Sequence, residues 1–80
     1  MWQLEYSDEA KFYFIDNDPY AFDLLVRIEE LKYFADAVPP EGCAPLEDNL
    51  YLWEVAAHFV LYEKLSAENR LIIAVVKPMA

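Results

Sequence analysis

The side chain best suited to proton transfer near neutral pH is His58, the only histidine in the chain. In a strand, alternation places His58, Val60 and Tyr62 on one face. Glu54 or Tyr62 could then supply the partner that general acid–base catalysis requires. The alternative is a structural histidine at the rim of a strand, and we favour this interpretation.

The only cysteine, Cys43, follows Gly42 in a predicted loop. A nucleophilic thiol needs electropositive surroundings, whereas Glu41, Glu47 and Asp48 lie close to it in the sequence. We therefore expect a structural or incidental thiol. One cysteine and one histidine also exclude an intrachain disulfide and a zinc site with four Cys or His ligands.

Paired carboxylates are the remaining groups that could act on a sugar or hold a divalent metal. The pairs are Asp16 and Asp18, Glu29 and Glu30, and Glu47 and Asp48. Only proximity in the sequence supports either role, and helix caps and solvated surface account for these residues. A glycine-rich phosphate loop is excluded because the chain has one glycine. The sequence thus predicts no metal and no cofactor.

The chain is acidic, with six basic and fifteen acidic residues and a net charge of −9. Binding to nucleic acid usually depends on a basic surface that displaces counterions from phosphates. The cations are scattered along the sequence, at Lys11, Arg27, Lys32, Lys64, Arg70 and Lys77. We therefore expect no direct binding to RNA or DNA.

The length of 80 residues predicts a single domain that spans residues 1–80. Hydrophobic residues make up 58% of the chain and include two Trp, six Tyr and five Phe. This is more apolar mass than one small core can hide, so it predicts an exposed apolar face for a partner or a homodimer. We expect a cytoplasmic protein, because no run approaches the roughly 20 apolar residues of a membrane span and no signal-peptide pattern is present.

The N-terminal half predicts one strand and two helices. Residues 2–6 alternate between apolar and polar side chains, as in a half-buried strand. Ser7 is a predicted N-cap for a helix over residues 8–16 that is apolar nearly all round. A long amphipathic helix is predicted from about residue 19 to 37, and residues 41–45 are predicted to be a linker.

The C-terminal half predicts three strands, over residues 50–55, 58–64 and 71–77, with a tight connection at Ala56-Ala57. Their short connections predict antiparallel neighbours. The first strand must join the same sheet, because its backbone would otherwise lack partners. The predicted fold is therefore α+β and two-layered, in the order β-α-α-β-β-β, with two helices on one face of an antiparallel sheet.

This order resembles the RelE/ParE superfamily of toxin–antitoxin toxins over nearly the whole chain, mostly through apolar patterns. The stretches that carry the resemblance are residues 24–31, 45–51, 58–63 and 71–77. RelE-type toxins cut ribosome-bound mRNA with clustered Arg and Lys and a Tyr or His, whereas ParE-type members bind DNA gyrase. Here Phe59 stands where the central strand usually carries Arg, and Trp53 and Glu54 stand where basic residues are expected.

A RelE/ParE-like protein that acts through protein binding is therefore our leading interpretation, and it implies no enzymatic activity. Its partner is an antitoxin-like or target protein that lies across the exposed apolar face. The predicted contacts are Trp2, Trp53, Phe59 and Tyr62. One alternative is a ribosome-dependent mRNA endoribonuclease with a reduced site, and another is a small structural or homodimerising module. The candidate catalytic residues of the nuclease alternative are His58, Tyr62, Arg70 and Lys77, with Lys64 as a further cation.

Overall fold

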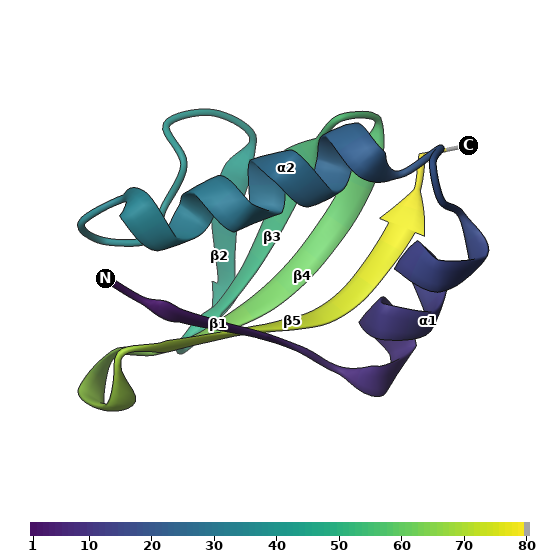
Figure 1. The fold of residues 1–80 in the computed structure, drawn as a ribbon. Coiled ribbons are helices and arrows are strands. Elements are labelled where there is room, and N and C mark those ends of the chain that lie inside the picture. The colour runs from purple at the N-terminus through teal and green to yellow at the C-terminus, as the bar shows by residue number, and fades with distance from the viewer. Residues whose placement is uncertain (80) are drawn as a thin grey trace.

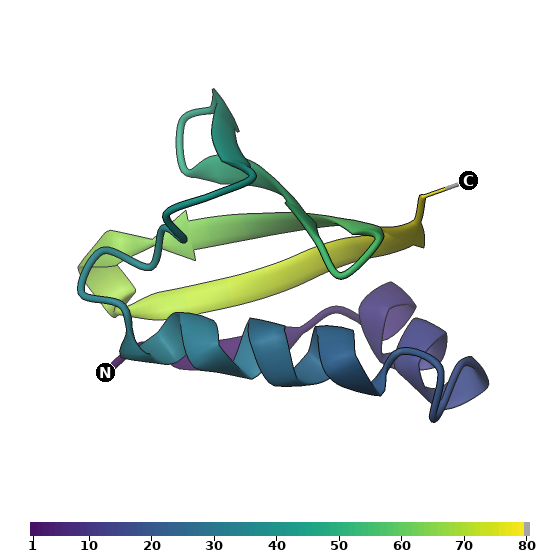
Figure 2. The same cartoon turned by 90° about the horizontal axis from the view of Figure 1, so that it is seen from above.

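A computed structural model describes residues 1–79 and shows a five-stranded sheet with two helices on one of its faces (Figures 1 and 2). The helices and strands are β1 (Gln3–Tyr6), α1 (Asp8–Asp16), α2 (Phe22–Glu30), β2 (Cys43–Glu47), β3 (Leu50–Val55), β4 (His58–Leu65) and β5 (Arg70–Pro78). Short 3-10 turns follow α2 and β4. The α+β class and the two-layer arrangement agree with the prediction.

The strands lie in the order β1-β5-β4-β3-β2. The last three strands form the predicted antiparallel meander. In contrast, β1 pairs parallel to β5, with Gln3 opposite Arg70, so the sheet is mixed and the purely antiparallel sheet was a wrong expectation. Side chains alternate in the same way in parallel and antiparallel strands, so the sequence pattern could not reveal the direction of β1 relative to β5. A parallel pair needs a long crossover, which the chain between β1 and β5 supplies.

The segment predicted as a linker instead contains β2, which pairs antiparallel with β3 and is bulged between Pro45 and Glu47. After Cys43 its residues are all exposed, so no alternating burial marks the strand. The single glycine, Gly42, has a φ of +74°, and a Cβ atom there would lie 2.5 Å from the Glu54 carbonyl oxygen. The Gly42 carbonyl accepts the Glu54 N–H at 2.8 Å. Glycine therefore permits the close approach that starts β2.

Helix α1 begins and ends as predicted. The Ser7 hydroxyl oxygen accepts the Ala10 N–H at 3.1 Å, and the hydroxyl donates to the Ala74 carbonyl at 2.6 Å. Asp8 and Glu9 occupy the first turn, where the helix dipole favours negative charge. The cap therefore both starts the helix and attaches it to β5.

Helix α2 is shorter than predicted, since it spans Phe22–Glu30 and continues only as a 3-10 turn over Leu31–Tyr33. The chain leaves the helix for a loop in which Ala37 has a φ of +56°. The Ala37 carbonyl accepts the hydroxyl of Tyr62 at 2.7 Å. Ala37 and Tyr62 are 25 residues apart in the sequence, so the helical periodicity could not reveal this contact.

The core lies between the helices and the sheet. Its buried members are Ala10, Leu24, Ile28, Leu31, Ala37, Trp53, Val55, Val60, Tyr62, Leu71, Ile73 and Val76. Within residues 1–79, no helix covers the other face of the sheet (Figure 2). Among residues 1–79 no helix is both long and apolar enough to cross a membrane.

Candidate functional site

His58 lies in a closed polar cluster at the start of β4. It is 2% exposed, and its Nδ1 lies 2.7 Å from the Ala56 carbonyl. Because a carbonyl only accepts, Nδ1 donates to it, and Nε2 shares a hydrogen bond of 2.6 Å with the Tyr13 hydroxyl. The ring of Tyr20 closes the cluster, 5.8 Å from the imidazole. Burial raises the pKa of Tyr13. Both ring nitrogens are thus bonded within the chain, as in the structural interpretation of His58.

Tyr62 points into the core with none of its surface exposed. Its hydroxyl donates to Ala37 and lies 3.4 Å from the Cys43 sulfur. The ring stacks on Tyr51, with 5.4 Å between the ring centroids. Burial, followed by the contact with Cys43, raises the pKa of Tyr62. The hydroxyl and the Cys43 thiol therefore act as parts of the packing.

Arg70 and Lys77 lie at opposite ends of β5. A separation of seven residues along a strand corresponds to roughly 23 Å. Arg70 forms a forked pair with Glu5, at 2.6 and 2.9 Å, and a further bond to Glu68 at 2.7 Å. The hydrogen bond to Glu5 raises the pKa of Arg70 and lowers that of Glu5. Lys77 is exposed opposite Phe59. The four candidate catalytic residues therefore do not converge on one site.

Other cations are also held by the chain itself. Arg27 pairs with Glu30 and Lys32 with Glu29. The Lys64 ammonium donates to the Asp36 carbonyl at 2.9 Å and lies over the rings of Trp2 and Tyr51. These contacts engage Arg27, Lys32 and Lys64 with groups of the chain itself.

The predicted contact residues divide into two groups. Trp53 and Tyr62 are in the core, at 2% and 0% exposure, because the helices cover their side of the β3–β4 hairpin. Trp2 is half-buried and donates from its indole to the Ala35 carbonyl at 3.3 Å. Phe59 is 38% exposed on the uncovered face of the sheet, beside Glu54 and Lys77. Only Trp2 and Phe59 therefore present surface to a partner in the manner expected.

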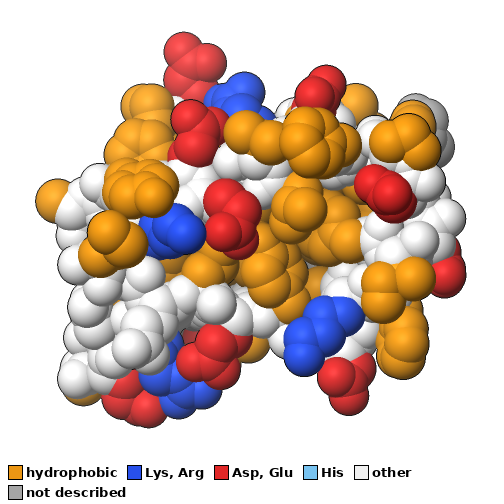
Figure 3. All heavy atoms as spheres, viewed as in Figure 1, with side chains coloured by type: hydrophobic (Ala, Val, Ile, Leu, Met, Phe, Trp, Pro, Cys, Tyr) orange, Lys and Arg blue, Asp and Glu red, His pale blue; other side chains and the backbone are white. Residues whose placement is uncertain are grey.

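A larger apolar surface lies on the outer side of the helices, where no contact was predicted. Its exposed side chains are Phe12, Ile15, Tyr20, Phe22, Val26 and Tyr33. On this face hydrophobic side chains lie among acidic and basic ones (Figure 3). The sequence indicated this surface, because α1 has apolar residues on all its sides and a helix on a small domain can bury only one side.

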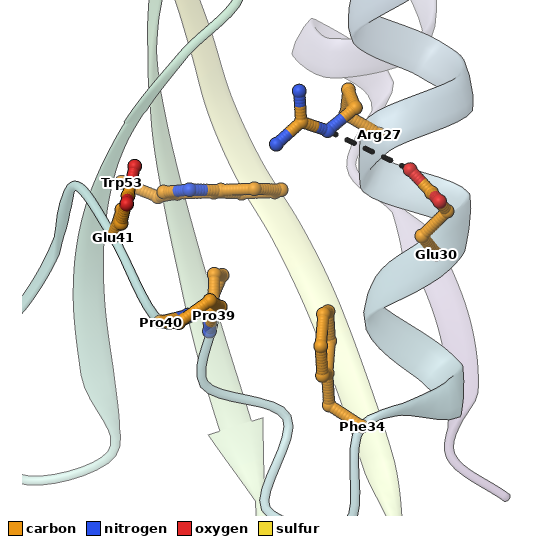
Figure 4. A pocket seen from close by; sticks show the side chains of 7 residues that line it. All are labelled: Arg27, Glu30, Phe34, Pro39, Pro40, Glu41 and Trp53. Atoms are coloured by element: carbon orange, nitrogen blue, oxygen red, sulfur yellow. Dashed lines mark ion pairs between the residues drawn. The ribbon is translucent and has the colours of Figure 1, made fainter.

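A cleft of about 420 Å³ lies between α2 and the loop that leads into β2 (Figure 4). Its lining residues are Arg27, Glu30, Phe34, Pro39, Pro40, Glu41 and Trp53. Trp53 reaches into it from β3, and Arg27 and Glu30 come from α2. The cleft thus combines aromatic and proline walls with two carboxylates. Among residues 1–79 no group of His, Cys, Asp and Glu is arranged to hold a metal ion.

The fold is similar to that of RelE toxins of known structure. The isolated RelE toxin of E. coli superposes with a TM-score of 0.72 at 10% identity, over 100% of this chain and 86% of RelE. The toxin–antitoxin complex RelBE2 of Mycobacterium tuberculosis matches with a TM-score of 0.67 at 14% identity, over 96% of both chains. The intact E. coli RelBE complex matches with a TM-score of 0.65 at 12% identity, over 100% and 99% of the chains.

Sequence comparison gives no corresponding match, either to a protein-family model or to a curated protein. The likeness therefore concerns the fold. It confirms the predicted architecture, while function has to be argued from the side chains of this chain.

Proposed function

We propose that this protein acts in the cytoplasm by binding another protein, an antitoxin-like or target protein, without cutting RNA itself. The similar structures RelBE and RelBE2 are toxin–antitoxin complexes, which supports an antitoxin-like partner here. The toxin-like fold also supports an antitoxin-like partner, and the ion pairs that hold Arg70 favour protein binding over RNA cleavage.

The observation that carries the proposal is the state of the candidate nuclease residues. Cleavage of RNA develops negative charge on a phosphate, and preorganised cations are the usual means to stabilise it. Here Arg70 is neutralised by Glu5 and Glu68, and Lys77 stands at the far end of the strand. His58 and Tyr62 are buried and hydrogen-bonded within the chain. Without a rearrangement, these groups cannot act together on one phosphate.

The exposed apolar side chains provide the surface that such a partner needs. Phe12 and Ile15 on α1 are 63% and 70% exposed, and Phe22 at the start of α2 is 58% exposed. A shallow groove between the helices is lined by the apolar side chains of Phe14, Ile15 and Leu25. A group of exposed apolar side chains of this kind often marks a protein contact.

Induced expression in a bacterial host tests the proposal, with growth and intact mRNA followed in the same culture. Growth arrest with intact mRNA is the expected result and points to a protein target. Arrest that coincides with mRNA cleavage would overturn the proposal in favour of the endoribonuclease. Absence of arrest would favour the structural or homodimerising module, which sedimentation of the purified protein would then identify.

Paired variants separate the two activities. Arg70→Gln combined with Lys77→Gln removes a partly buried and an exposed cation. This double change should leave arrest unchanged, whereas a nuclease would lose its activity. Ile15→Ser combined with Phe22→Ser should abolish arrest, because both side chains lie on the helical surface. A matched control, Leu46→Ser, alters an exposed apolar residue of β2 away from that surface and should retain activity.

A further inference from the structure

The face of the sheet opposite the helices carries an exposed aromatic side chain between two opposite charges. Phe59 on β4 is 38% exposed, with Glu54 opposite it on β3 and Lys77 opposite it on β5. Both charged residues are exposed. They lie two strands apart, roughly 10 Å, which is too far for a direct ion pair. Among residues 1–79, neither takes part in an ion pair. This row therefore presents an acid, a ring and a base in a fixed order.

The next row on the same face is apolar. The register aligns Leu52, Leu61 and Val75 across β3, β4 and β5. Each lies two residues along its strand from a member of the charged row, so alternation places it on the same face. All three are half-buried, whereas the intervening row belongs to the core. An apolar row beside a charged row suits packing against a second sheet.

The order of the charges fits a second copy of the same surface. In a twofold dimer one patch packs on itself, so each contact occurs twice. With the axis along β4, Phe59 lies over its own copy, and Lys77 lies over Glu54 of the second copy. An axis across the strands would instead place each charge over its own kind. The charged row therefore selects the axis along the strand.

We propose that the protein forms a twofold homodimer through this face, held by Phe59 at the axis and by two ion pairs between Glu54 and Lys77. The apolar rows of the two copies pack on each other, with the sheets about 10 Å apart as in a sandwich. The helical surface lies on the other side of the two-layer fold (Figure 2), so the dimer leaves that surface free. The proposal thus goes beyond the protein-binding function and does not depend on it.

A carboxylate farther along β4 opposes the contact. Glu63 is half-buried on the same face, four residues from Phe59 or roughly 13 Å along the strand. Packed sheets cross at about 30°, so the two copies of Glu63 diverge from the axis, and their repulsion weakens the dimer without preventing it. The net charge of −9 on each copy adds a long-range repulsion. We therefore expect a weak dimer.

Sedimentation velocity of the full chain over a concentration series tests the proposal. We expect a shift from monomer to dimer below about 1 mM. Phe59→Ser should remain monomeric over the same range. Phe12→Ser is the matched control, because Phe12 is 63% exposed on α1, and it should dimerise like the unchanged chain. A chain that stays monomeric, or a dimer that persists in Phe59→Ser, would overturn the proposal.

An exchange of the charges tests the axis. Glu54→Lys and Lys77→Glu each place like charges opposite one another at two positions, so each should weaken dimerisation by at least about tenfold. The double variant Glu54→Lys, Lys77→Glu restores opposite charges and should dimerise again. An equal mixture of the two single variants should form a heterodimer, because every facing pair then has opposite signs. Failure of either rescue would overturn the twofold arrangement.

A matched pair of neutral variants separates the two carboxylates of this face. Glu54→Gln removes both ion pairs and should weaken the dimer by about fivefold. Glu63→Gln removes a repulsion and should strengthen it. The dispersion of the NMR spectrum reports whether each variant is folded. Equal weakening by the two changes would contradict the assigned pairing.

The outcome is separate from that of the expression experiment. A monomeric chain that arrests growth with intact mRNA would refute the dimer and leave the protein-binding function intact. Cleavage of mRNA during growth arrest would refute the protein-binding function, whatever sedimentation finds.

Discussion

The β3–β4 hairpin carries a closed cluster at one end and an open cleft a few residues away, and the two differ in how their polar groups are used. At His58 both ring nitrogens have partners within the chain. At Trp53 the neighbouring carboxylates of Glu30 and Glu41 face an open volume. The residue type most often associated with catalysis is thus committed to structure. The open cleft lies instead where no reactive residue is present.

The largest effect should come from opening the closed cluster. His58→Ala removes a buried ring and two hydrogen bonds, so the free energy of unfolding should fall by about 3 kcal/mol. Urea denaturation measures this loss. His58→Asn, which retains a donor near Ala56, should recover part of it. A loss below about 1 kcal/mol would contradict the structural role of His58.

The same truncation at the open cleft should have a small effect on stability. Phe34 is 39% exposed, so Phe34→Ala should lower the free energy of unfolding by less than about 1 kcal/mol. If Phe34→Ala cost as much as His58→Ala, the two regions would not differ in the way described.

Gly42→Ala should have the second-largest effect on stability, because it disturbs the loop that lines the cleft. The added Cβ would clash with the Glu54 carbonyl, and the backbone is in the left-handed region. We expect a loss of roughly 2 kcal/mol in the free energy of unfolding. Ala44→Gly in the adjacent strand is the control and should cost about 1 kcal/mol or less. Equal losses would show that the position of Gly42 has no special requirement.

A stabilising change should be available at the hairpin that joins the two regions. Ala56 and Ala57 have φ values of +50° and +61°, which suit Asn-Gly in a two-residue turn. The double change Ala56→Asn, Ala57→Gly should raise the free energy of unfolding by about 1 kcal/mol, as measured in urea. A decrease in the free energy of unfolding would indicate that the hydrogen bond between His58 and the carbonyl of residue 56 requires alanine at position 56.

The smallest effect should be a dependence on acid at the opposite edge of the sheet. The pKa of Glu5 is lowered, chiefly by its hydrogen bond to Arg70. The pair therefore stabilises the fold above the ordinary pKa of 4.5, and this contribution is lost as the pH falls through the lower folded-state pKa. Arg70→Gln should flatten that part of the curve of stability against pH. An unchanged acid limb in the variant would contradict the link.

Local signals in the sequence predicted the elements whose contacts are near in the chain. Ser7 with its acidic neighbours marked the start of α1, and the period of two marked β3, β4 and β5. The strand β2 was missed because its side chains are exposed and it contains Pro45, so only pairing with β3 makes it a strand. The end of α2 was missed because apolar residues at helical spacing continue to Ala35, beyond the point where the helix tightens into a 3-10 turn.

The sequence predicted that apolar surface would be exposed, but it did not predict where that surface or the cleft would lie. The excess of aromatic residues correctly indicated exposed apolar surface. In the predicted strand over residues 50–55, alternate residues such as Tyr51, Trp53 and Val55 share one face, yet period two alone does not say which face the helices cover. The cleft itself was invisible, because it brings Trp53 together with Phe34 and Glu41 through tertiary packing.

The parallel pairing of β1 with β5 also has a consequence for synthesis of the chain. A ribosome makes β1 first, whereas the partner of Gln3, Arg70, emerges 67 residues later. Contacts of such long separation form late because closing the intervening loop costs entropy. Until β5 has been synthesised, the apolar residues of β1 and α1 that pack against it stay exposed. We therefore expect the nascent chain to bind a chaperone or a co-translational partner.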